Sequence, residues 1–241
     1  MSEIISGRNP VVELLETSKP EIELIKVAGG AGGKKIDKIR RLAGERNINL
    51  QEVAKDELIR LAGKNHQGVA ARVKSLSPLD LNEFLSTVSF GSPARVVILD
   101  KIQDPVNLGK IARTALYFGV DGLIKTAHQS APLSNTVLKT SAGAAARLPV
   151  AEVNNLQNAI QKLKERRFWL VGTSLAGEQF PGDIPTDRNL AIVFGHEGEG
   201  LSRLTEEKCD YLVSIPGSGS FDSLNVGVAA GIIIHDLQSP G

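Results

Sequence analysis

The chain has 241 residues, a hydrophobic content of 41% and a formal net charge of +1, which fits one large or two modest folded domains and excludes disorder as the dominant state. Its single cysteine, Cys209, cannot form an internal disulfide, so a disulfide-stapled fold is excluded and we expect the reducing environment of the cytoplasm. We find no secretion signal, and the most apolar stretch, residues 226–234, is far shorter than the ~20 residues of a membrane span, so we expect no membrane insertion.

The first 75 residues have the alternating pattern of a small α/β domain and a modest excess of basic residues. They contain 14 Lys and Arg against 10 Asp and Glu, whereas the rest of the chain contains 14 against 17. Helix-type and strand-type spacings of apolar residues alternate along this part. The predicted helices are 10–16, 34–46 and 56–61, and the predicted strands are 22–27, 50–53 and 69–73.

A glycine-rich loop at residues 29–33 precedes the second predicted helix, on which basic residues gather. Backbone amides of such a loop and of a helix N-terminus can hold phosphate, and lysines add contacts that release counterions from nucleic acid. A flexible loop and a solvated helix face would explain the same residues. The loop is therefore a candidate phosphate site with an ordinary structural alternative.

Residues 76–92 have turn formers at both ends and a weakly amphipathic middle, so we predict a linker there. From residue 93 onward, apolar runs without alternation indicate strands covered on both faces, as in a parallel sheet with crossover helices. The predicted strands are 96–99, 122–124, 168–172, 190–194 and 211–215, and the predicted helices are 108–118, 156–166 and 223–237. The fold class is therefore α/β, with a small N-terminal domain and a larger C-terminal domain.

Glycine-containing segments follow three of these strands and begin at Asp100, Val193 and Ile215. Loops at the carboxyl ends of parallel strands converge, so these three segments are expected to form one pocket. Neither GxGxxG after a strand nor GxxxxGK[ST] is present, which excludes the familiar phosphate loops. The four histidines are scattered, and we expect no catalytic metal.

These three segments resemble the signature motifs of the SpoU (TrmH-type) family of SPOUT RNA methyltransferases, and the resemblance covers residues 93–241. The matching residues are Asn107, Gly109 and Arg113 in NLGKIART, residues 195–201 in GHEGEGL, and Ser223, Leu224 and Asn225 in IPGSGSFDSLNVGVAAG. The resemblance implies a C-terminal deep trefoil knot, in which the third motif passes beneath an earlier loop. Knots are rare, and only the resemblance predicts one here.

The segments SGRNPVVELLE and NHQGVAARV of the N-terminal part resemble the accessory domain of the RlmB-like branch of this family, which is similar to ribosomal-protein RNA-binding folds. The resemblance implies that residues 1–75 bind the RNA substrate and that residues 93–241 are the methyltransferase domain. It also implies guanosine 2′-O-methylation, with a guanosine of large-subunit (23S) ribosomal RNA as the target. We expect RNA, and neither DNA nor a membrane, as the partner.

The resemblance implies S-adenosylmethionine as the methyl donor, bound in a bent form mostly by backbone groups of the loops. Those contacts correspond to Gly195, Ile215 and Leu224 in this chain. Glycine at such a position permits close approach of the backbone. Family sites are completed across a two-fold interface, so a homodimer is expected.

The resemblance also implies a set of catalytic residues: Asn107, Arg113, Glu197, Ser223 and Asn225. A guanidinium stays protonated and makes a poor base, so we expect Arg113 to clamp the target phosphate and stabilise the developing alkoxide. The other four would orient Arg113 and the substrate, with Glu197 as the bidentate partner of the guanidinium. Which group accepts the 2′-hydroxyl proton is left open.

Each of these side chains has a structural alternative. Asn107 could cap a helix beginning at residue 108, and Ser223 could cap the last helix, roles worth ~1 kcal/mol each. Glu197 and Arg113 could face solvent.

The chain also departs from the family pattern at three positions. Lys110 stands where a small apolar residue is usual, Gly217 where Met is common, and Gly227 where Ser is common.

Two other functions remain open beside the leading one. The first is a non-catalytic RNA-binding assembly factor, which S-adenosylmethionine binding would distinguish. The second is a transfer-RNA or antibiotic-resistance methyltransferase of the same family, which mapping of the modified nucleotide would distinguish.

Overall fold

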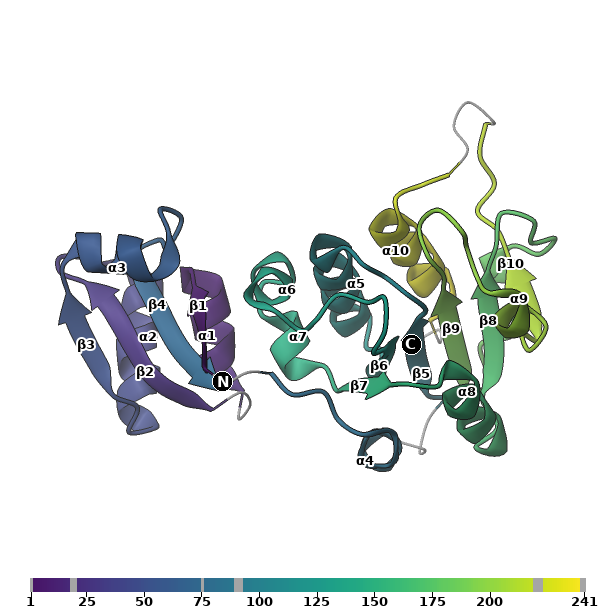
Figure 1. The fold of residues 1–241 in the computed structure, drawn as a ribbon, viewed down its shortest axis with the longest axis horizontal. Helices are drawn as coiled ribbons and strands as arrows, with labels where there is room; N and C mark the ends of the chain where they lie inside the picture. Colours follow the sequence, from purple (N-terminus) through teal and green to yellow (C-terminus); the bar gives the residue numbers. More distant parts are fainter. Residues whose placement is uncertain (1, 18–20, 75, 89–92, 219–222, 239–241) are drawn as a thin grey trace. The chain divides into compact units, whose positions relative to one another are not determined.

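The computed structural model describes residues 2–17, 21–74, 76–88, 93–218 and 223–238, and the chain divides into two compact units. Unit 1 consists of Met1–Ser77 and Leu133–Arg147, and unit 2 of Pro78–Pro132 and Leu148–Gly241. Figure 1 shows the elements of both units with their labels. The chain therefore leaves unit 2 after residue 132 and returns to it at residue 148.

Unit 1 contains a four-stranded sheet in the order β1-β4-β2-β3. Strands β2 and β3 are parallel and joined through α2, whereas β4 is antiparallel to both β1 and β2. The elements are β1 (Ser2–Ser6), α1 (Arg8–Glu16), β2 (Ile22–Ala28), α2 (Lys34–Glu45), β3 (Leu50–Val53), α3 (Lys55–Ala62) and β4 (Val69–Lys74). The six predicted elements of this part are confirmed to within two residues. Strand β1 was not predicted, because a five-residue strand shows too few alternations.

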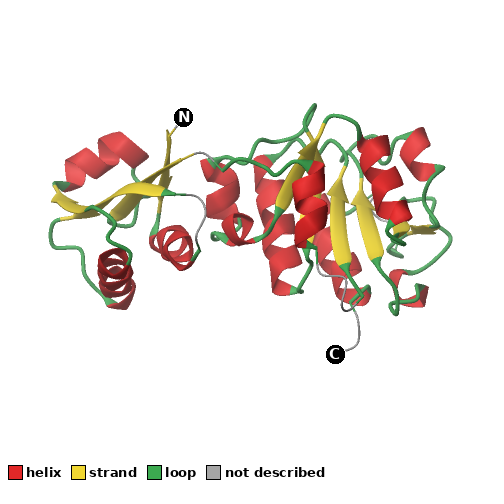
Figure 2. Cartoon of the chain, turned by 90° about the horizontal axis from the view of Figure 1, so that it is seen from below, coloured by secondary structure: helices red, strands yellow, loops and turns green. Residues whose placement is uncertain are grey.

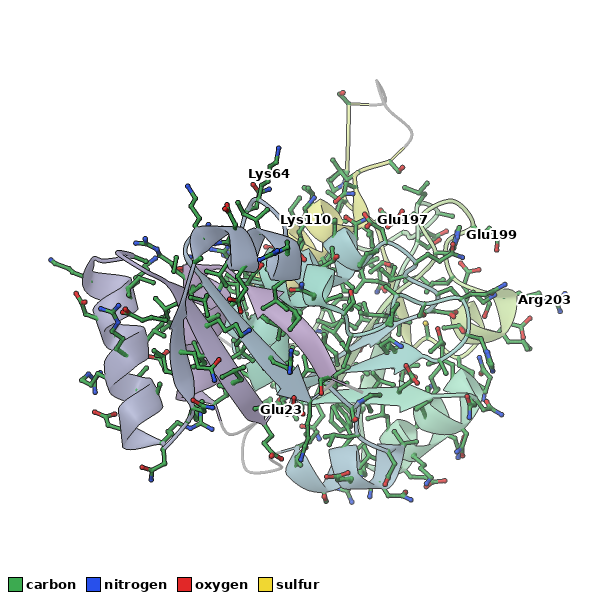
Figure 3. The ribbon with its side chains drawn as sticks, turned by 60° about the vertical axis from the view of Figure 1, so that its left-hand side comes forward. Glu23, Lys64, Lys110, Glu197, Glu199 and Arg203 are labelled. Atoms are coloured by element: carbon green, nitrogen blue, oxygen red, sulfur yellow. The ribbon has the colours of Figure 1, made fainter. Side chains whose placement is uncertain are left out.

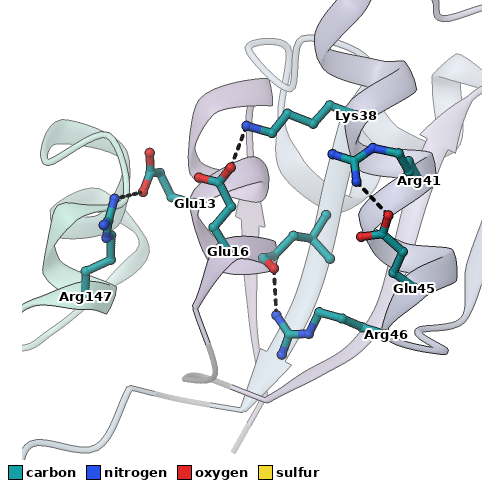
Figure 4. Close-up of polar contacts among 8 residues, drawn as sticks. Glu13, Glu16, Lys38, Arg41, Glu45, Arg46 and Arg147 are labelled. Carbon is teal, nitrogen blue, oxygen red and sulfur yellow. Dashed lines mark hydrogen bonds and ion pairs between the residues drawn. The ribbon is translucent and has the colours of Figure 1, made fainter.

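Helices α1 and α2 pack together, and polar contacts tie their ends (Figure 4). The Arg46 guanidinium donates to the carbonyl oxygens of Leu14 and Leu15 at 3.1 and 2.9 Å. The last carbonyls of a helix have no partner within the helix, so this guanidinium supplies one. Lys38 pairs with Glu16 at 2.5 Å. Arg40 and Arg41 of the same helix also pair with carboxylates, so three basic residues of the candidate phosphate-binding helix are occupied within the domain.

Residues 133–147 belong to unit 1, although the sequence places them in the C-terminal domain. They form α6 (Asn135–Thr140) and α7 (Ala144–Arg147), which contact β1 and α1. Arg147 pairs with Glu13 at 3.2 Å (Figure 4). At Gly143, whose φ is +94°, a Cβ would lie 2.3 Å from Cβ of Glu13. This close contact explains why glycine is required there.

Unit 2 contains a six-stranded, entirely parallel sheet in the order β10-β8-β9-β5-β6-β7, with helices on both faces (Figure 2). The strands are β5 (Arg95–Leu99), β6 (Gly122–Thr126), β7 (Val150–Val153), β8 (Trp169–Thr173), β9 (Leu190–Phe194) and β10 (Tyr211–Val213). The helices are α4 (Leu81–Thr87), α5 (Pro105–Tyr117), α8 (Leu156–Glu165), α9 (Arg203–Glu206) and α10 (Val226–Asp236), with a 3₁₀ turn, η1 (Pro181–Asp183). The predicted parallel α/β sheet is confirmed; β7, α4 and α9 were not predicted.

The segment that we predict as a linker, residues 76–92, contains α4, whose Phe84 and Leu85 are buried in the core of unit 2. Asp80 caps this helix by accepting hydrogen bonds from two backbone N–H groups of its first turn. A Cβ at Gly122 would lie 2.4 Å from the Phe84 ring, so that glycine makes room for the ring. The predicted linker is thus mostly folded structure, while its last part, residues 89–92, lies outside the described residues.

Candidate functional site

The topology of unit 2 places its candidate site between β5 and β9. Strands β6 and β7 extend the sheet on one side of β5, and β9, β8 and β10 extend it on the other. Loops that follow neighbouring strands diverge where the strand order reverses, and this opens a crevice at the carboxyl edge. The first and second motifs follow β5 and β9, so both lie at this reversal. The backbone N–H of Asp100 donates to the Phe194 carbonyl at 2.9 Å and holds the two strand ends together.

The first motif lies in helix α5, which begins earlier than predicted. Asp104 is its N-cap and accepts from the Val106 N–H at 2.9 Å, and Pro105 occupies the first turn, where no backbone donor is needed. Asn107 is therefore inside the helix, and it is only 3% exposed. The capping role considered for Asn107 is wrong, which leaves its amide free for a tertiary contact.

The second motif folds into a tight hairpin after β9. His196 and Gly200 exchange two backbone hydrogen bonds of 3.0 and 2.8 Å, and the His196 ring accepts from the N–H groups of Gly198 and Glu199. At Gly195 a Cβ would lie 2.3 Å from backbone atoms of Gly200. No side chain fits at Gly195, because the hairpin folds back onto it.

A chain of hydrogen bonds joins side chains from all three motifs. The Asn107 side-chain N–H donates to the Glu197 carboxylate, and the Asn225 side-chain N–H donates to Oδ1 of Asn107 at 3.1 Å. The Asn225 Oδ1 accepts from the Gly227 N–H at 3.1 Å and caps α10. The capping role considered for Ser223 is therefore wrong, and Asn225 has it instead. Three of the predicted catalytic residues meet at one point.

Arg113 lies apart from this network in the single chain. It follows Asn107 by six residues, which places it on a different face of α5, and it is exposed. Among the described residues, no hydrogen bond or ion pair involves its guanidinium, and the Glu197 carboxylate binds Asn107. The expected Glu197–Arg113 pair is therefore wrong within one chain. Glu197 faces the amide because the hairpin brings it over the buried side of the helix.

The remaining predicted residues lie in the third motif. Ile215 is half-buried in the segment after β10, and Ser223 and Leu224 are exposed directly before α10. Residues 219–222 of this motif lie outside the described residues. The three side chains thus lie on the two described parts of the motif, and no hydrogen bond between them occurs in the described part of the chain.

Asp100 is a polar residue of this region that the sequence analysis did not select. It ends β5 and is 4% exposed, and burial raises the pKa of its carboxyl group. Hydrogen bonds from the Ser202 backbone and the Thr205 hydroxyl oppose that rise. The Asp100 carboxylate therefore holds the start of α9, and with it the second motif, against the end of β5. The sequence signal that could have identified Asp100 is a carboxylate directly after the apolar strand 96–99.

Two of the departures from the family pattern prove to be neighbours. A Cβ at Gly227 would lie 3.2 Å from Cβ and Cδ of Lys110, so the missing side chain at 227 gives room to the lysine stem. Lys110 is exposed (Figure 3), and among the described residues its ammonium pairs with no carboxylate. The site therefore carries a cation beside Asn225, one helical turn from Arg113.

The described residues contain no group of three or more His, Cys, Asp or Glu side chains placed to hold a metal ion. None of the helices among them has the length and apolar character needed to cross a membrane.

Comparison with family models assigns both parts of the sequence. Residues 94–235 match the SpoU rRNA Methylase family, and residues 4–79 match a family described as RNA 2′-O ribose methyltransferase substrate binding. A Staphylococcus aureus (strain MSSA476) protein, whose name refers to the TrmH family of tRNA/rRNA methyltransferases, is 39% identical over 97% of this chain and 94% of its own length. An uncharacterized tRNA/rRNA methyltransferase of Mycolicibacterium paratuberculosis is 36% identical over 98% of this chain and 77% of its own length.

Solved structures give a similar result. The SpoU methyltransferase AviRb from Streptomyces viridochromogenes superposes with a TM-score of 0.82 at 26% identity, covering 98% of this chain and 88% of its own. The same enzyme has been solved in complex with the cofactor AdoMet, at 25% identity and a TM-score of 0.82, covering 98% and 89%. An A. aeolicus TrmH/SpoU tRNA modifying enzyme matches 66% of this chain and 80% of its own, with a TM-score of 0.55 at 26% identity.

Proposed function

We propose that this chain, which belongs to the SpoU rRNA methylase family, transfers a methyl group from S-adenosylmethionine to a ribose 2′-hydroxyl of RNA. Family membership makes it an RNA methyltransferase, and a SpoU relative was crystallised with AdoMet. The observation that supports this function best is the hydrogen-bonded chain Glu197–Asn107–Asn225, because it joins the three motifs where the strand order of the sheet reverses, between β5 and β9. The enzyme is expected to act in the cytoplasm.

We assign the cofactor to the carboxyl ends of β9 and β10, where Gly195, Ile215 and Leu224 would hold it mostly through backbone groups. The absence of a side chain at Gly195 fits this assignment, because the hairpin and the strand end approach each other closely there. A deep trefoil knot around the third motif would bend the donor. When bound, S-adenosylmethionine supplies an electrophilic methyl group on sulfur, and the chain's task is to hold a ribose hydroxyl in line with it.

We assign Arg113 to the site of a second copy of the chain. In one copy the guanidinium is exposed on α5, which packs against α10, and exposed apolar side chains lie on both helices. Tyr117 is 82% exposed, Val228 50% and Ile232 38%. Large apolar side chains gathered on adjacent helices mark an interaction surface, and two-fold symmetry would bury the same face of both copies. In this homodimer Arg113 clamps the RNA phosphate beside the network of its partner.

We propose a guanosine of 23S ribosomal RNA as the target. The substrate-binding family match covers residues 4–79, and AviRb matches 98% of the chain, whereas the A. aeolicus tRNA modifying enzyme matches 66%. The additional N-terminal domain thus favours a substrate that needs a second RNA contact. A transfer-RNA target is the second candidate, because the names of the relatives combine tRNA and rRNA.

Incubating the protein with labelled S-adenosylmethionine and, in parallel reactions, 23S RNA or transfer RNA tests the reaction. We expect label on a ribose 2′-oxygen, and we expect Arg113→Ala to lower the rate at least 100-fold, the order found when a stabilising donor at a developing oxyanion is removed. Arg203→Ala is the matched control, because Arg203 is an exposed arginine on α9 with its side chain 89% accessible (Figure 3). Label on a base would contradict the chemistry, and label on transfer RNA alone would select the second candidate.

Mixing two inactive variants tests the shared site. Arg113→Ala and Asn107→Ala, mixed and allowed to exchange subunits, should regain partial activity, because half of the sites in a mixed dimer contain both intact residues. No recovery, with subunit exchange shown by mass, would place Arg113 in the site of its own chain. If the unmodified protein bound RNA but did not bind S-adenosylmethionine, that result would instead indicate a non-catalytic RNA-binding factor.

A further inference from the structure

Unit 1 has an open surface pocket of about 470 Å³, called the cavity below, that the proposed methyl-transfer site does not use. It lies where the loop after β2, the start of α3 and the loop before β4 meet the start of α1. Its lining residues are Arg8, Ala28, Gly29, Gly30, Ala31, Lys55, His66, Gln67 and Gly68. Its volume lies within the ~300–1,000 Å³ typical of small-ligand pockets, so it is large enough for more than a bare ion.

Two cations line this cavity, and one of them is fixed in place. The backbone N–H of Arg8 donates to the Gln67 side-chain oxygen and Nε of Arg8 donates to the Gln67 carbonyl, both at 3.0 Å. These bonds leave the two terminal guanidinium nitrogens free for a ligand. Neither Arg8 nor Lys55 pairs with a carboxylate in the described part of the chain. Fixed guanidinium groups and lysines are the usual partners of phosphate oxygens.

The N-terminus of α2 lies beside the same guanidinium. Its N-cap, Gly33, has no side chain to satisfy the first backbone N–H groups of the helix. The position of a Cβ on Gly33 would be 3.6 Å from Nη1 of Arg8, so the guanidinium and the helix N-terminus are neighbours. Both attract an anion, and a phosphate placed between them would gain from each.

His66 is the second, independent feature. It is only 3% exposed and lines the cavity, and its Nδ1 accepts from the Gly68 N–H at 2.9 Å. That bond occupies Nδ1 and leaves Nε2 as the ring nitrogen with which a ligand can form a hydrogen bond, beside the apolar wall of Ala28.

We propose that this cavity binds a single nucleotide of the RNA, with its phosphate between Arg8, Lys55 and the N-terminus of α2, and its ribose or base against His66. The proposal rests on the proposed function in that it takes RNA as the substrate. It gives unit 1 a defined contact with one splayed-out nucleotide, in place of a general attraction to the RNA backbone. Binding of a nucleotide that has left its stack is a usual way for proteins to recognise single-stranded RNA.

A negative charge added at Gly29 provides the first test. Gly29 lines the cavity, its φ is not positive, and a Cβ there would meet only the Val53 carbonyl at 3.8 Å, so Gly29→Asp should fold. Gly44→Asp adds the same charge to the same domain at an exposed glycine of α2 with open space around it. We expect Gly29→Asp to weaken binding of a fluorescent, mixed-sequence, single-stranded RNA about tenfold or more, and Gly44→Asp less than twofold. Equal effects of the two variants would overturn the proposal.

Lysine removal provides the second test. Lys55→Ala removes a cation that lines the cavity, and Lys64→Ala removes one that points away from the domain (Figure 3). The slope of the logarithm of the binding constant against the logarithm of the salt concentration should decrease in magnitude by about one for Lys55→Ala. It should be unchanged for Lys64→Ala. A 4-thiouridine in the RNA should crosslink to residues 28–31 or 66–68. Crosslinks found only elsewhere would overturn the proposal.

The outcome for the cavity is separate from that for the enzyme. If Gly29→Asp binds RNA normally and methylation proceeds, the cavity proposal fails while the proposed function stands. If the unmodified protein binds RNA through the cavity and transfers no methyl group, the proposed function fails while the cavity remains an RNA site.

Discussion

At the scale of single residues, the site depends on where a side chain is absent as much as on where one is present. Gly195 lets the second-motif hairpin fold back onto the end of β9, and Gly227 leaves room for the Lys110 stem. Lys110 and Gly227 both depart from the family pattern, and a Cβ at residue 227 would crowd the Lys110 stem. The glycine therefore leaves room for a cation beside Asn225 without disturbing the network that Asn225 completes.

Gly195→Ala should therefore abolish binding of S-adenosylmethionine and lower the free energy of unfolding by ~1–3 kcal/mol, because the new methyl group would overlap backbone atoms that cannot move independently. The matched control is Gly198→Ala in the same hairpin, where a Cβ would meet only the His196 ring at 3.7 Å. Calorimetry with the cofactor and urea unfolding measure both effects. Normal cofactor binding by Gly195→Ala would show that the hairpin does not shape the cofactor site.

At the scale of elements, the ends of strands β5 and β9 set the positions of the motifs. The N–H of Asp100 extends the pairing of these strands, while its carboxylate accepts hydrogen bonds from Ser202 and Thr205 at the start of α9. Asp100 thus connects the end of β5 to the segment that follows the neighbouring strand, β9. This arrangement keeps Glu197 over the buried side of α5.

Asp100 should also make stability depend on pH. Burial raises its pKa in the folded protein above the unfolded value of about 3.9, so the folded state binds the proton more tightly. This contribution to stability is therefore present at low pH and is lost as the pH rises through the folded pKa. Asp100→Asn cannot ionise, so its free energy of unfolding relative to the unmodified protein should increase as the pH rises from about 4 and then level off. A difference that is constant with pH, measured by urea unfolding, would contradict this.

At the scale of the whole molecule, the chain crosses between its units more than once. Helices α6 and α7 come from the methyltransferase part of the sequence, yet they pack on β1 and α1 in unit 1. Removing the N-terminal domain would therefore also remove the surface on which these helices rest. A truncated protein would change in two places, which is why point variants are the better test of RNA binding.

Deleting residues 1–77 should speed amide hydrogen exchange in residues 135–147 and leave β5 and β9 protected, because only the former lose their packing partners. The comparison of the two regions within one sample, by mass spectrometry, is its own control. Unchanged protection of 135–147 would mean that these helices are stabilised without unit 1.

The sequence by itself determined the α/β class, the small N-terminal domain, the parallel sheet and the three motif loops, because apolar periodicity and glycine spacing are local properties that a strand or helix expresses directly. The resemblance also predicted a set of site residues. The tertiary structure decided the partners: Glu197 binds Asn107 and not Arg113, Asn225 caps α10 in place of Ser223, and residues 133–147 pack on unit 1. The contacts Glu197–Asn107, Asn225–Asn107 and Arg147–Glu13 join residues 90, 118 and 134 positions apart, and they depend on strand order and on the fit of a few glycines, which no local pattern contains.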